Sequence, residues 1–150
     1  DLTPAQAETS TEPAPQEQTG LRMLIVDDHE INRRAFTLIL QGAVASIVTA
    51  ENGQDALDIL ALERFDLVLM DLNMPTMGGL ECTRALRAAT GPNQATPVIA
   101  LTASAARSEI DVCLAVGMNA FVMKPVEAAE LFGAIERVLD AQGAAVAAVA

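Results

Sequence analysis

Polar and charged residues stand directly after four of the short apolar runs in this 150-residue sequence. They are Asp27 and Asp28 after the first run, Asp71 after the third, Thr102 after the fourth, and Lys124, the only lysine, after the fifth. Each of them alone is as well explained by a polar loop, but together they suggest one site. Carboxylates that share a crevice repel one another unless a cation lies among them, and oxygen ligands of this kind suit Mg2+ better than a caged Ca2+.

Such a set of residues can transfer a phosphoryl group. A carboxylate acts as the nucleophile toward phosphorus and forms an acyl phosphate, while a metal ion and a lysine neutralise the charge on the transferring oxygens. Asp71 is the best candidate for the nucleophile, because it ends the most apolar run and should be the most rigidly held. Asp27 and Asp28 would then hold the metal, although an aspartate pair before a helix can also cap the free N–H groups of that helix.

The spacing of apolar residues predicts five strands that alternate with five helices. The strands are expected at Arg22 to Val26, Ser46 to Ala50, Leu67 to Met70, Val98 to Leu101 and Ala120 to Met123. The helices are expected at Glu30 to Gln41, Gln54 to Glu63, Gly79 to Ala89, Ala105 to Val116 and Glu127 to Asp140. Short connections between alternating strands and helices imply an α/β fold with a doubly wound parallel sheet, whose site lies outside the carboxyl ends of the strands. The polar residues would therefore meet at one edge of the sheet.

Composition limits the possible classes of function. A chain that is 51% hydrophobic suits one globular domain, and its formal net charge of -11 argues against direct contact with nucleic acid. No apolar run approaches the roughly 20 residues that span a bilayer, so we expect no membrane contact by this segment and a cytoplasmic location. Cys82 and Cys113 both fall within expected helices, which suggests buried thiols rather than a disulfide or a zinc site.

The chain divides into three segments by composition. Residues 1–20 contain three prolines and four acidic groups but no basic group, which predicts a disordered linker. Residues 21–141 hold the alternating pattern and form the expected domain. The alanine-rich residues 142–150 predict a flexible tail or a frayed helix extension. Because the chain begins with aspartate rather than methionine, we expect it to be a piece of a longer natural chain.

Four stretches of the sequence closely resemble the response regulator receiver family. They are LIVDDHEINRR, LVLMDLNMPTMGGLE, TPVIALTAS and AFVMKP, at separate strand ends, and the resemblance covers Leu21 to Asp140. It implies a flavodoxin-like (βα)5 fold, with a five-stranded parallel sheet in the strand order 2-1-3-4-5. It also implies a phosphoacceptor of two-component systems, which takes a phosphoryl group from a phosphohistidine in a Mg2+-dependent reaction and then changes shape.

The resemblance assigns a role to each residue of the acidic site. Asp71 would be the phosphoacceptor. Asp28, Asp71 and the backbone carbonyl of Asn73 would bind Mg2+ directly, and Asp27 would act through water. Lys124 would pair with the phosphoryl group. These roles follow from the family and are expectations for the present sequence.

The resemblance also predicts how the site is shaped and how it responds. The Thr102 hydroxyl would move to hydrogen-bond a phosphoryl oxygen, and Pro125 would follow a cis peptide bond, which is tolerated only before proline. The small side chain of Ala103 leaves a path for the phosphodonor and for water. Phe121 stands where many members of the family carry a switch tyrosine, so its ring can rotate but offers no hydroxyl for an outward hydrogen bond.

Other functions fit the sequence less well. A phosphatase of the haloacid dehalogenase-like type needs an acid or base two residues after the nucleophile, where Asn73 stands and cannot shuttle a proton. A nucleotide-binding module needs a glycine-rich phosphate loop after the first strand, where this sequence is acidic, and a pseudo-receiver would lack the acceptor or the lysine.

His29 resembles a phosphorylated kinase histidine only superficially. No long helical dimerisation region surrounds it, so we expect a solvent-facing loop residue.

Two contexts remain open for a receiver domain. The proline-rich linker and the sequences around the aspartates resemble the C-terminal receivers of hybrid histidine kinases. In that context a kinase phosphohistidine domain would be the donor, and a histidine phosphotransfer protein would be the acceptor. A stand-alone single-domain regulator is the other alternative. In either context the domain would catalyse its own phosphorylation and dephosphorylation. A partner is expected to dock at the first helix near Ile31 and at the loop around Pro125 and Val126.

Overall fold

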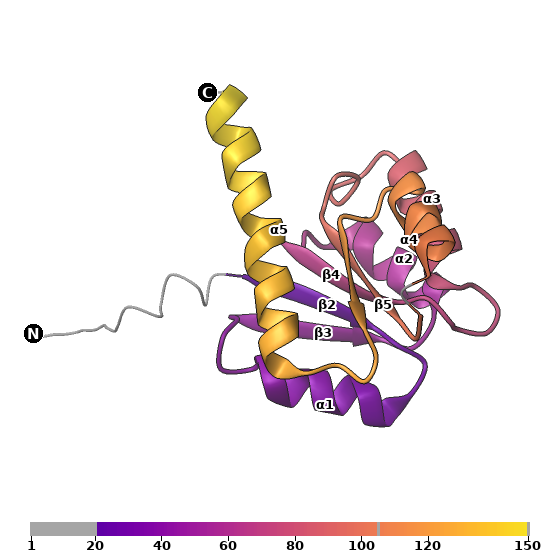
Figure 1. Cartoon of the computed structure of the whole chain (residues 1–150). Coiled ribbons are helices and arrows are strands. Elements are labelled where there is room, and N and C mark those ends of the chain that lie inside the picture. Colours follow the sequence, from indigo (N-terminus) through magenta and orange to yellow (C-terminus); the bar gives the residue numbers. More distant parts are fainter. Residues whose placement is uncertain (1–20, 105, 150) are drawn as a thin grey trace, which may run out of the picture.

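The structure is a computed structural model that describes residues 21–104 and 106–149, with side chains up to residue 141. The linker predicted at residues 1–20 lies outside the described residues. Five strands alternate with five helices along the described chain (Figure 1). The strands are β2 (Arg22–Val26), β3 (Ser46–Ala50), β4 (Leu67–Asp71), β5 (Val98–Thr102) and β6 (Ala120–Met123). The helices are α1 (Glu30–Leu40), α2 (Gly53–Leu62), α3 (Gly79–Ala88), α4 (Arg107–Ala115) and α5 (Ala128–Val149).

The strands form one parallel sheet in the order β3-β2-β4-β5-β6. This is the predicted order 2-1-3-4-5, with the direction of the strand order reversing between β2 and β4. In the register, Val26 pairs with both Ala50 and Met70, and Thr102 pairs with Met123. The carboxyl ends of all the strands therefore lie along the same edge of the sheet, so the residues that follow them are brought together.

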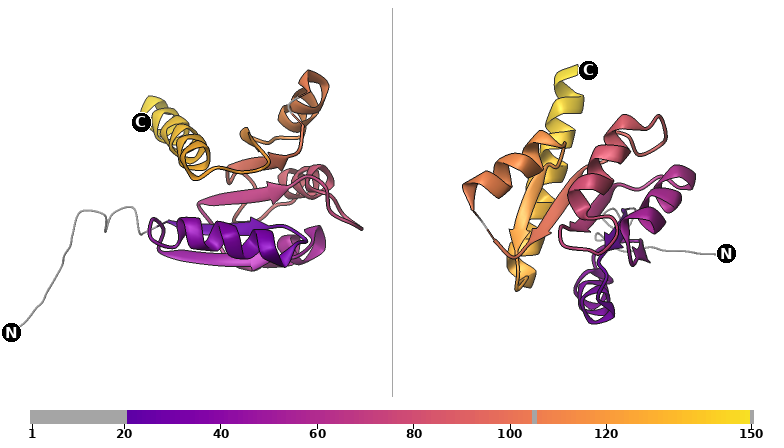
Figure 2. Two further views of the ribbon diagram at one scale, coloured as in Figure 1. Left: turned by 60° about the horizontal axis from the view of Figure 1, so that its bottom comes forward. Right: turned by 90° about the vertical axis from the view of Figure 1, so that its right-hand side faces the viewer.

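Each strand contributes side chains to two separate cores, because successive side chains point to opposite faces of a sheet. Leu24, Val68 and Ala100 belong to the core on the face covered by α2, α3 and α4. Met23 and Leu69 belong to the core on the opposite face, which α1 and α5 cover (Figure 2). Every residue of β4 and β5 is buried, which explains why their sequences are continuous apolar runs rather than alternating ones.

The helix bounds agree with the predicted ranges to within two residues, apart from the end of α5. That helix continues to Val149 rather than ending at Asp140, so of the two expectations for this segment, a flexible tail or a helix extension, residues 142–149 agree with the helix extension. Alanine has the highest helix propensity, and it dominates this segment. Among the described residues, no helix is both long and apolar enough to cross a bilayer.

Candidate functional site

Acidic side chains meet at the carboxyl edge of the sheet. One ligand atom from each of Asp27, Asp28, His29 and Asp71 lies within 4.8 Å of the corresponding atoms of the others. The ammonium group of Lys124 lies 3.0 Å from Asp71 Oδ1 and 3.7 Å from Asp27 Oδ2. The sheet therefore brings together the acidic pair after β2, the aspartate that ends β4 and the lysine after β6.

The two oxygens of Asp71 have different surroundings. Oδ1 accepts hydrogen bonds from Lys124 Nζ at 3.0 Å and from the backbone N–H of Asn73 at 3.2 Å. Oδ2 is buried and has no hydrogen-bond partner among the described residues. Because Asp71 as a whole is only 1% exposed, the unpaired oxygen carries a large desolvation penalty unless something else approaches it.

Burial raises the pKa of the Asp71 carboxyl above its ordinary value of 3.8. The hydrogen bond from Lys124 acts in the opposite direction, the negative charge of Asp27 raises the pKa further, and the net direction is upward. The metal-free site therefore holds its negative charge at a cost in stability.

Replacing Asp71 with asparagine should stabilise the metal-free protein near neutral pH. Below pH 3.8 the carboxyl is neutral in both the folded and the unfolded chain, so the charge has no effect. As the pH rises through the higher pKa of the folded state, the folded wild type must ionise a buried group and loses stability. We expect Asp71→Asn to raise the free energy of unfolding by about 1–3 kcal/mol at neutral pH, with a smaller gain toward the acid range. Urea unfolding in EDTA measures this difference.

The control for this comparison is Asp58→Asn, since the Asp58 carboxylate is exposed on α2 and accepts a hydrogen bond from the Gln54 side chain. It should change the free energy of unfolding little at any pH. A loss of stability in Asp71→Asn at neutral pH would contradict the expected penalty for the buried charge.

The two aspartates after β2 differ in the hydrogen bonds that their carboxylates accept. Asp27 is buried, and its side chain accepts hydrogen bonds from the His29 backbone N–H at 2.9 Å and from Asn32 Nδ2 at 3.3 Å. Asp28 is partly buried. Its Oδ1 lies 3.1 Å from His29 Nδ1 but accepts no well-aligned hydrogen bond from the described residues. The oxygens of Asp28 and Asp71 that accept no hydrogen bond lie within one cluster and fit a divalent cation, which would bind both.

Thr102 ends β5 as predicted, but its hydroxyl is already engaged. It donates to the carbonyl oxygen of Ser104 at 2.9 Å and accepts from the backbone N–H of Ser104 at 3.1 Å. Ala103 is exposed between them, and Phe121 is partly buried against the core under α2, α3 and α4. The peptide bond between Lys124 and Pro125 is cis, which confirms that prediction.

Some residues that shape the site were not singled out from the sequence. Arg33 Nη1 donates to the carbonyl oxygen of Asp27 at 2.8 Å, and the Asn32 amide contacts the carboxylate of the same residue. His29 is exposed, as expected, but its Nδ1 lies 3.1 Å from Asp28 Oδ1. Asn32 and Arg33 could have been found from the sequence. They lie in the first turn of the helix that follows the acidic pair, and side chains in a first turn lie next to the preceding loop.

Glycine at position 79 allows α3 to begin against the backbone of Asp71. A Cβ built on Gly79 would overlap the carbonyl oxygen of Asp71 and would lie 2.9 Å from Met70 Cγ. Only a residue without a side chain therefore fits here unless the end of β4 moves.

Gly79→Ala should consequently destabilise the domain by about 1–3 kcal/mol, the usual cost of overpacking a buried position. Gly91→Ala is the matched control, because a Cβ at Gly91 would meet nothing within 4 Å. Denaturant unfolding of the two variants gives the comparison. An equal loss in the free energy of unfolding of both variants would mean that the close approach of Gly79 to Asp71 does not limit the size of the side chain there.

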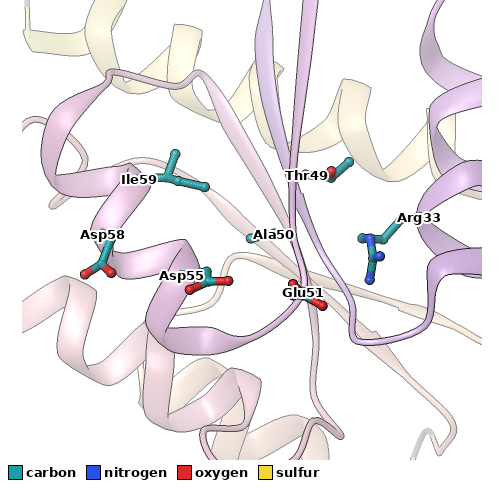
Figure 3. A pocket seen from close by; sticks show the side chains of 7 residues that line it. All are labelled: Arg33, Thr49, Ala50, Glu51, Asp55, Asp58 and Ile59. Atoms are coloured by element: carbon teal, nitrogen blue, oxygen red, sulfur yellow. The ribbon is translucent and has the colours of Figure 1, made fainter.

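A separate cavity of about 310 Å3 lies beside the site, between α1 and α2 at the end of β3 (Figure 3). Arg33 forms its α1 side, and its other lining residues are Thr49, Ala50, Glu51, Asp55, Asp58 and Ile59. Its carboxylates are exposed, and Asp55 and Asp58 already accept hydrogen bonds from the side chains of Asn52 and Gln54. This cavity therefore lacks the unpaired buried oxygens that distinguish the cluster around Asp71.

Comparison with known sequences finds a family match and similar proteins. The family described as response regulator receiver domain matches residues 23–136. The sensor histidine kinase RcsC of Escherichia coli is 39% identical over 123 residues, which are 82% of this chain and 13% of that protein. The sensory/regulatory protein RpfC of Xanthomonas campestris is 39% identical over 114 residues, which are 75% of this chain and 16% of that protein. The chain thus spans a small part of these relatives.

Solved structures with the same fold agree with this result. The receiver domain of a Pseudomonas aeruginosa sensor histidine kinase, with a magnesium ion coordinated in its active site cleft, has a TM-score of 0.73 and 30% identity over 81% of this chain and 98% of that one. The chemotaxis response regulator CheY4 of Vibrio cholerae has a TM-score of 0.75 and 32% identity over 80% of this chain and 99% of that one.

Proposed function

The chain belongs to the response regulator receiver domain family and is the receiver domain of a two-component system, and from this we propose that it accepts a phosphoryl group on Asp71 in a reaction that requires Mg2+. One observation carries the proposal. Asp71 is a buried carboxylate that has one oxygen hydrogen-bonded to Lys124 and the other without a hydrogen-bond partner among the described residues, in one cluster with the carboxylate of Asp28. The oxygen beside Lys124 has its negative charge balanced by the ammonium group, and the other oxygen can bind a cation or attack phosphorus.

The proposed reaction moves a phosphoryl group from a phosphohistidine to Asp71. A carboxylate oxygen forms the new bond to phosphorus, the bond between phosphorus and the donor imidazole nitrogen breaks, and that nitrogen keeps the bonding electron pair. Lys124 Nζ, now 3.0 Å from Asp71 Oδ1, would transfer its hydrogen bond to a phosphoryl oxygen. Mg2+, when bound, neutralises the charge on the transferring oxygens.

The same contacts support the assignment of the metal ligands. Asp28 and Asp71 would bind Mg2+ directly through their unpaired oxygens, together with the backbone carbonyl of Asn73. Asp27 would act through water, because its carboxylate already accepts hydrogen bonds from the His29 backbone and from Asn32. Mg2+ commonly keeps several waters in protein sites of this kind.

The conformational response would begin at Thr102. To reach a phosphoryl oxygen, its hydroxyl must leave the carbonyl oxygen of Ser104, to which it now donates at 2.9 Å. Release of that hydrogen bond would loosen the start of the segment between β5 and α4, and the ring of Phe121 could then repack. Backbone amide chemical shifts of Ser104 and Phe121 before and after phosphorylation test this step, and unchanged shifts would contradict it.

The likeness to part of a sensor histidine kinase favours a C-terminal receiver of a hybrid kinase. The donor would then be a kinase phosphohistidine domain, the acceptor a histidine phosphotransfer protein, and the location cytoplasmic. A stand-alone regulator is the second candidate, because the chemotaxis regulator CheY4 is matched over almost its whole length. A haloacid dehalogenase-like phosphatase is not favoured, since Asn73 offers no acid or base after the nucleophile.

The partner would dock on the exposed side of α1, together with the loop around Pro125 and Val126. Ile31 is 80% exposed at the start of this helix, close in sequence to the acidic pair. An apolar side chain this exposed beside the site is suited to burial by a partner that delivers a phosphohistidine to Asp71.

Phosphotransfer from a protein donor tests the proposed function and its docking surface together. A radiolabelled, phosphorylated kinase phosphohistidine domain from the same genome should pass its label to the wild type within minutes. Compared with the wild type, Ile31→Asp should slow this transfer by about tenfold or more, because a charge would enter an apolar contact. The labelling of Ile31→Asp by acetyl phosphate serves as the reference, since that small donor does not need the docking surface. Leu62→Asp on α2, where Leu62 is 83% exposed, is the matched control and should transfer like the wild type. Equal slowing by both variants would contradict docking on α1.

A further inference from the structure

We infer that His29 supplies a nitrogen ligand at the aspartate cluster, so that the site binds transition-metal ions such as Zn2+ more tightly than an all-oxygen site would. The inference rests on the proposed function, because it concerns the same metal site. It goes further by assigning a role in metal selectivity to a residue that the phosphoryl transfer does not use.

The distances around His29 fit shared coordination of one ion. Ligand atoms that occupy neighbouring positions on an ion with bonds of about 2.1 Å lie about 3.0–3.4 Å apart in octahedral or tetrahedral geometry. His29 Nδ1 lies 3.1 Å from Asp28 Oδ1 and 3.6 Å from Asp27 Oδ1. An ion that satisfies Asp28 can therefore reach the imidazole with little movement of either side chain.

Two buried carboxylate oxygens in the same cluster accept no hydrogen bond from the described residues. Asp28 Oδ1, which lies 3.1 Å from the imidazole nitrogen, is one of the buried oxygens that accept no hydrogen bond from the described residues. Asp71 contributes another, and Asp71 is 1% exposed. The direct side-chain ligands would thus be two carboxylate oxygens and one imidazole nitrogen, in addition to the backbone carbonyl of Asn73. This is a donor set of a kind that proteins use for zinc and iron.

The His29 ring contacts the aspartates of the cluster, and most of its side chain faces solvent. Its side chain is 67% exposed, so the ring can turn toward an ion without disturbing the core. Its backbone is held at the start of α1, where its N–H donates to Asp27 Oδ1 at 2.9 Å. Mg2+ prefers oxygen ligands and gains little from an imidazole, whereas Zn2+ and Ni2+ gain a favoured ligand. His29 should therefore change the selectivity of the site more than its affinity for Mg2+.

Metal titration of the whole chain tests this inference. His29 is the only histidine, so the imidazole nitrogens of one residue report directly in a long-range 1H–15N spectrum. The thiols compete weakly for zinc, because burial raises the pKa of Cys82 to about 12 and also raises that of Cys113. Calorimetric titrations with ZnCl2 and with MgCl2 in separate experiments give the two affinities.

We expect one equivalent of Zn2+ to bind the wild type and shift the imidazole signals, and Mg2+ to bind with little shift. His29→Asn should weaken Zn2+ binding by about tenfold or more and Mg2+ binding by less than about threefold. Asp28→Asn should also weaken Zn2+ binding and remove the imidazole shift at one equivalent, since the two residues share the ion.

Other outcomes would overturn the inference or the proposal beneath it. Equal Zn2+ affinity in the wild type and His29→Asn would overturn the inference, as would an imidazole shift that persists in Asp28→Asn, because His29 would then bind zinc alone on the surface. Failure of the wild type to bind Mg2+ would instead contradict the proposed metal site itself.

Discussion

We expect Asp71→Asn to abolish phosphoryl incorporation from acetyl phosphate, whereas the wild type should gain one phosphoryl group per chain. The amide of asparagine has the shape of the carboxylate but no anionic oxygen to attack phosphorus, so the variant retains the site and loses the nucleophile. The fold should survive, because asparagine removes a buried negative charge whose ionisation is unfavourable in the metal-free protein. Intact-mass spectrometry after incubation with acetyl phosphate and Mg2+ measures the result.

Controls separate loss of the nucleophile from loss of the site. Asp58→Asn changes an exposed carboxylate on α2 and should be labelled like the wild type. The wild type in EDTA should remain unlabelled, because the unpaired oxygens of Asp28 and Asp71 then lack their cation. Labelling of Asp71→Asn at the wild-type level would refute the assignment of the acceptor, and labelling in EDTA would refute the role of the metal.

We expect Lys124→Gln to slow labelling by about two to three orders of magnitude. The ammonium group of Lys124 is the charged partner of Asp71 Oδ1 at 3.0 Å and is mostly buried, with 26% of the side chain exposed. In such a position a positive charge stabilises the negative charge on the transferring oxygens far more than a neutral amide does. The initial rate of mass increase under acetyl phosphate gives the comparison.

Lys124→Arg is the matched variant for charge, because it keeps the positive charge but not the compact shape of the ammonium group. It should fall between the wild type and Lys124→Gln. If the glutamine variant were labelled within about threefold of the wild-type rate, Lys124 would have no part in charge neutralisation. An amide spectrum of each variant checks that the fold is intact.

The fold could be predicted in detail because the burial of each element follows from its local sequence. RMLIV, LVLM and VIAL are apolar runs long enough for a strand and too short for a helix, and they become the central strands β2, β4 and β5. Their alternation with helical stretches then restricts the topology to parallel pairing. The end of α5 was harder to predict, because alanine-rich sequence favours a helix by propensity but carries no periodic apolar pattern.

Much of the site could be predicted for a simple geometric reason. In a parallel sheet the residue after each strand lies at the same edge, so sequence position alone predicts that Asp27, Asp71 and Lys124 meet. The distances and unpaired atoms could not be predicted, since they depend on side-chain conformations. The contact between His29 and Asp28, and the engaged hydroxyl of Thr102, are of this kind.

Long-range polar contacts away from the site were also beyond prediction. Asn93 is 1% exposed, accepts a hydrogen bond from the Phe65 backbone N–H and donates to the carbonyl oxygen of Leu60. Arg87 Nε and Nη2 donate to the carbonyl oxygen of Gly117, and burial lowers the pKa of this arginine. Both join segments far apart in sequence, and a single sequence does not indicate which partners a polar side chain will find.

Chemical mapping of the phosphorylated residue decides where the phosphoryl group is attached. The wild type, labelled with acetyl phosphate and Mg2+, is treated with borohydride, which reduces an aspartyl phosphate to an alcohol, and its peptides are sequenced by mass spectrometry. We expect the reduced residue at position 71 alone. A modification found instead at Asp28 or at His29 would contradict the proposal that the carboxylate of Asp71 is the acceptor.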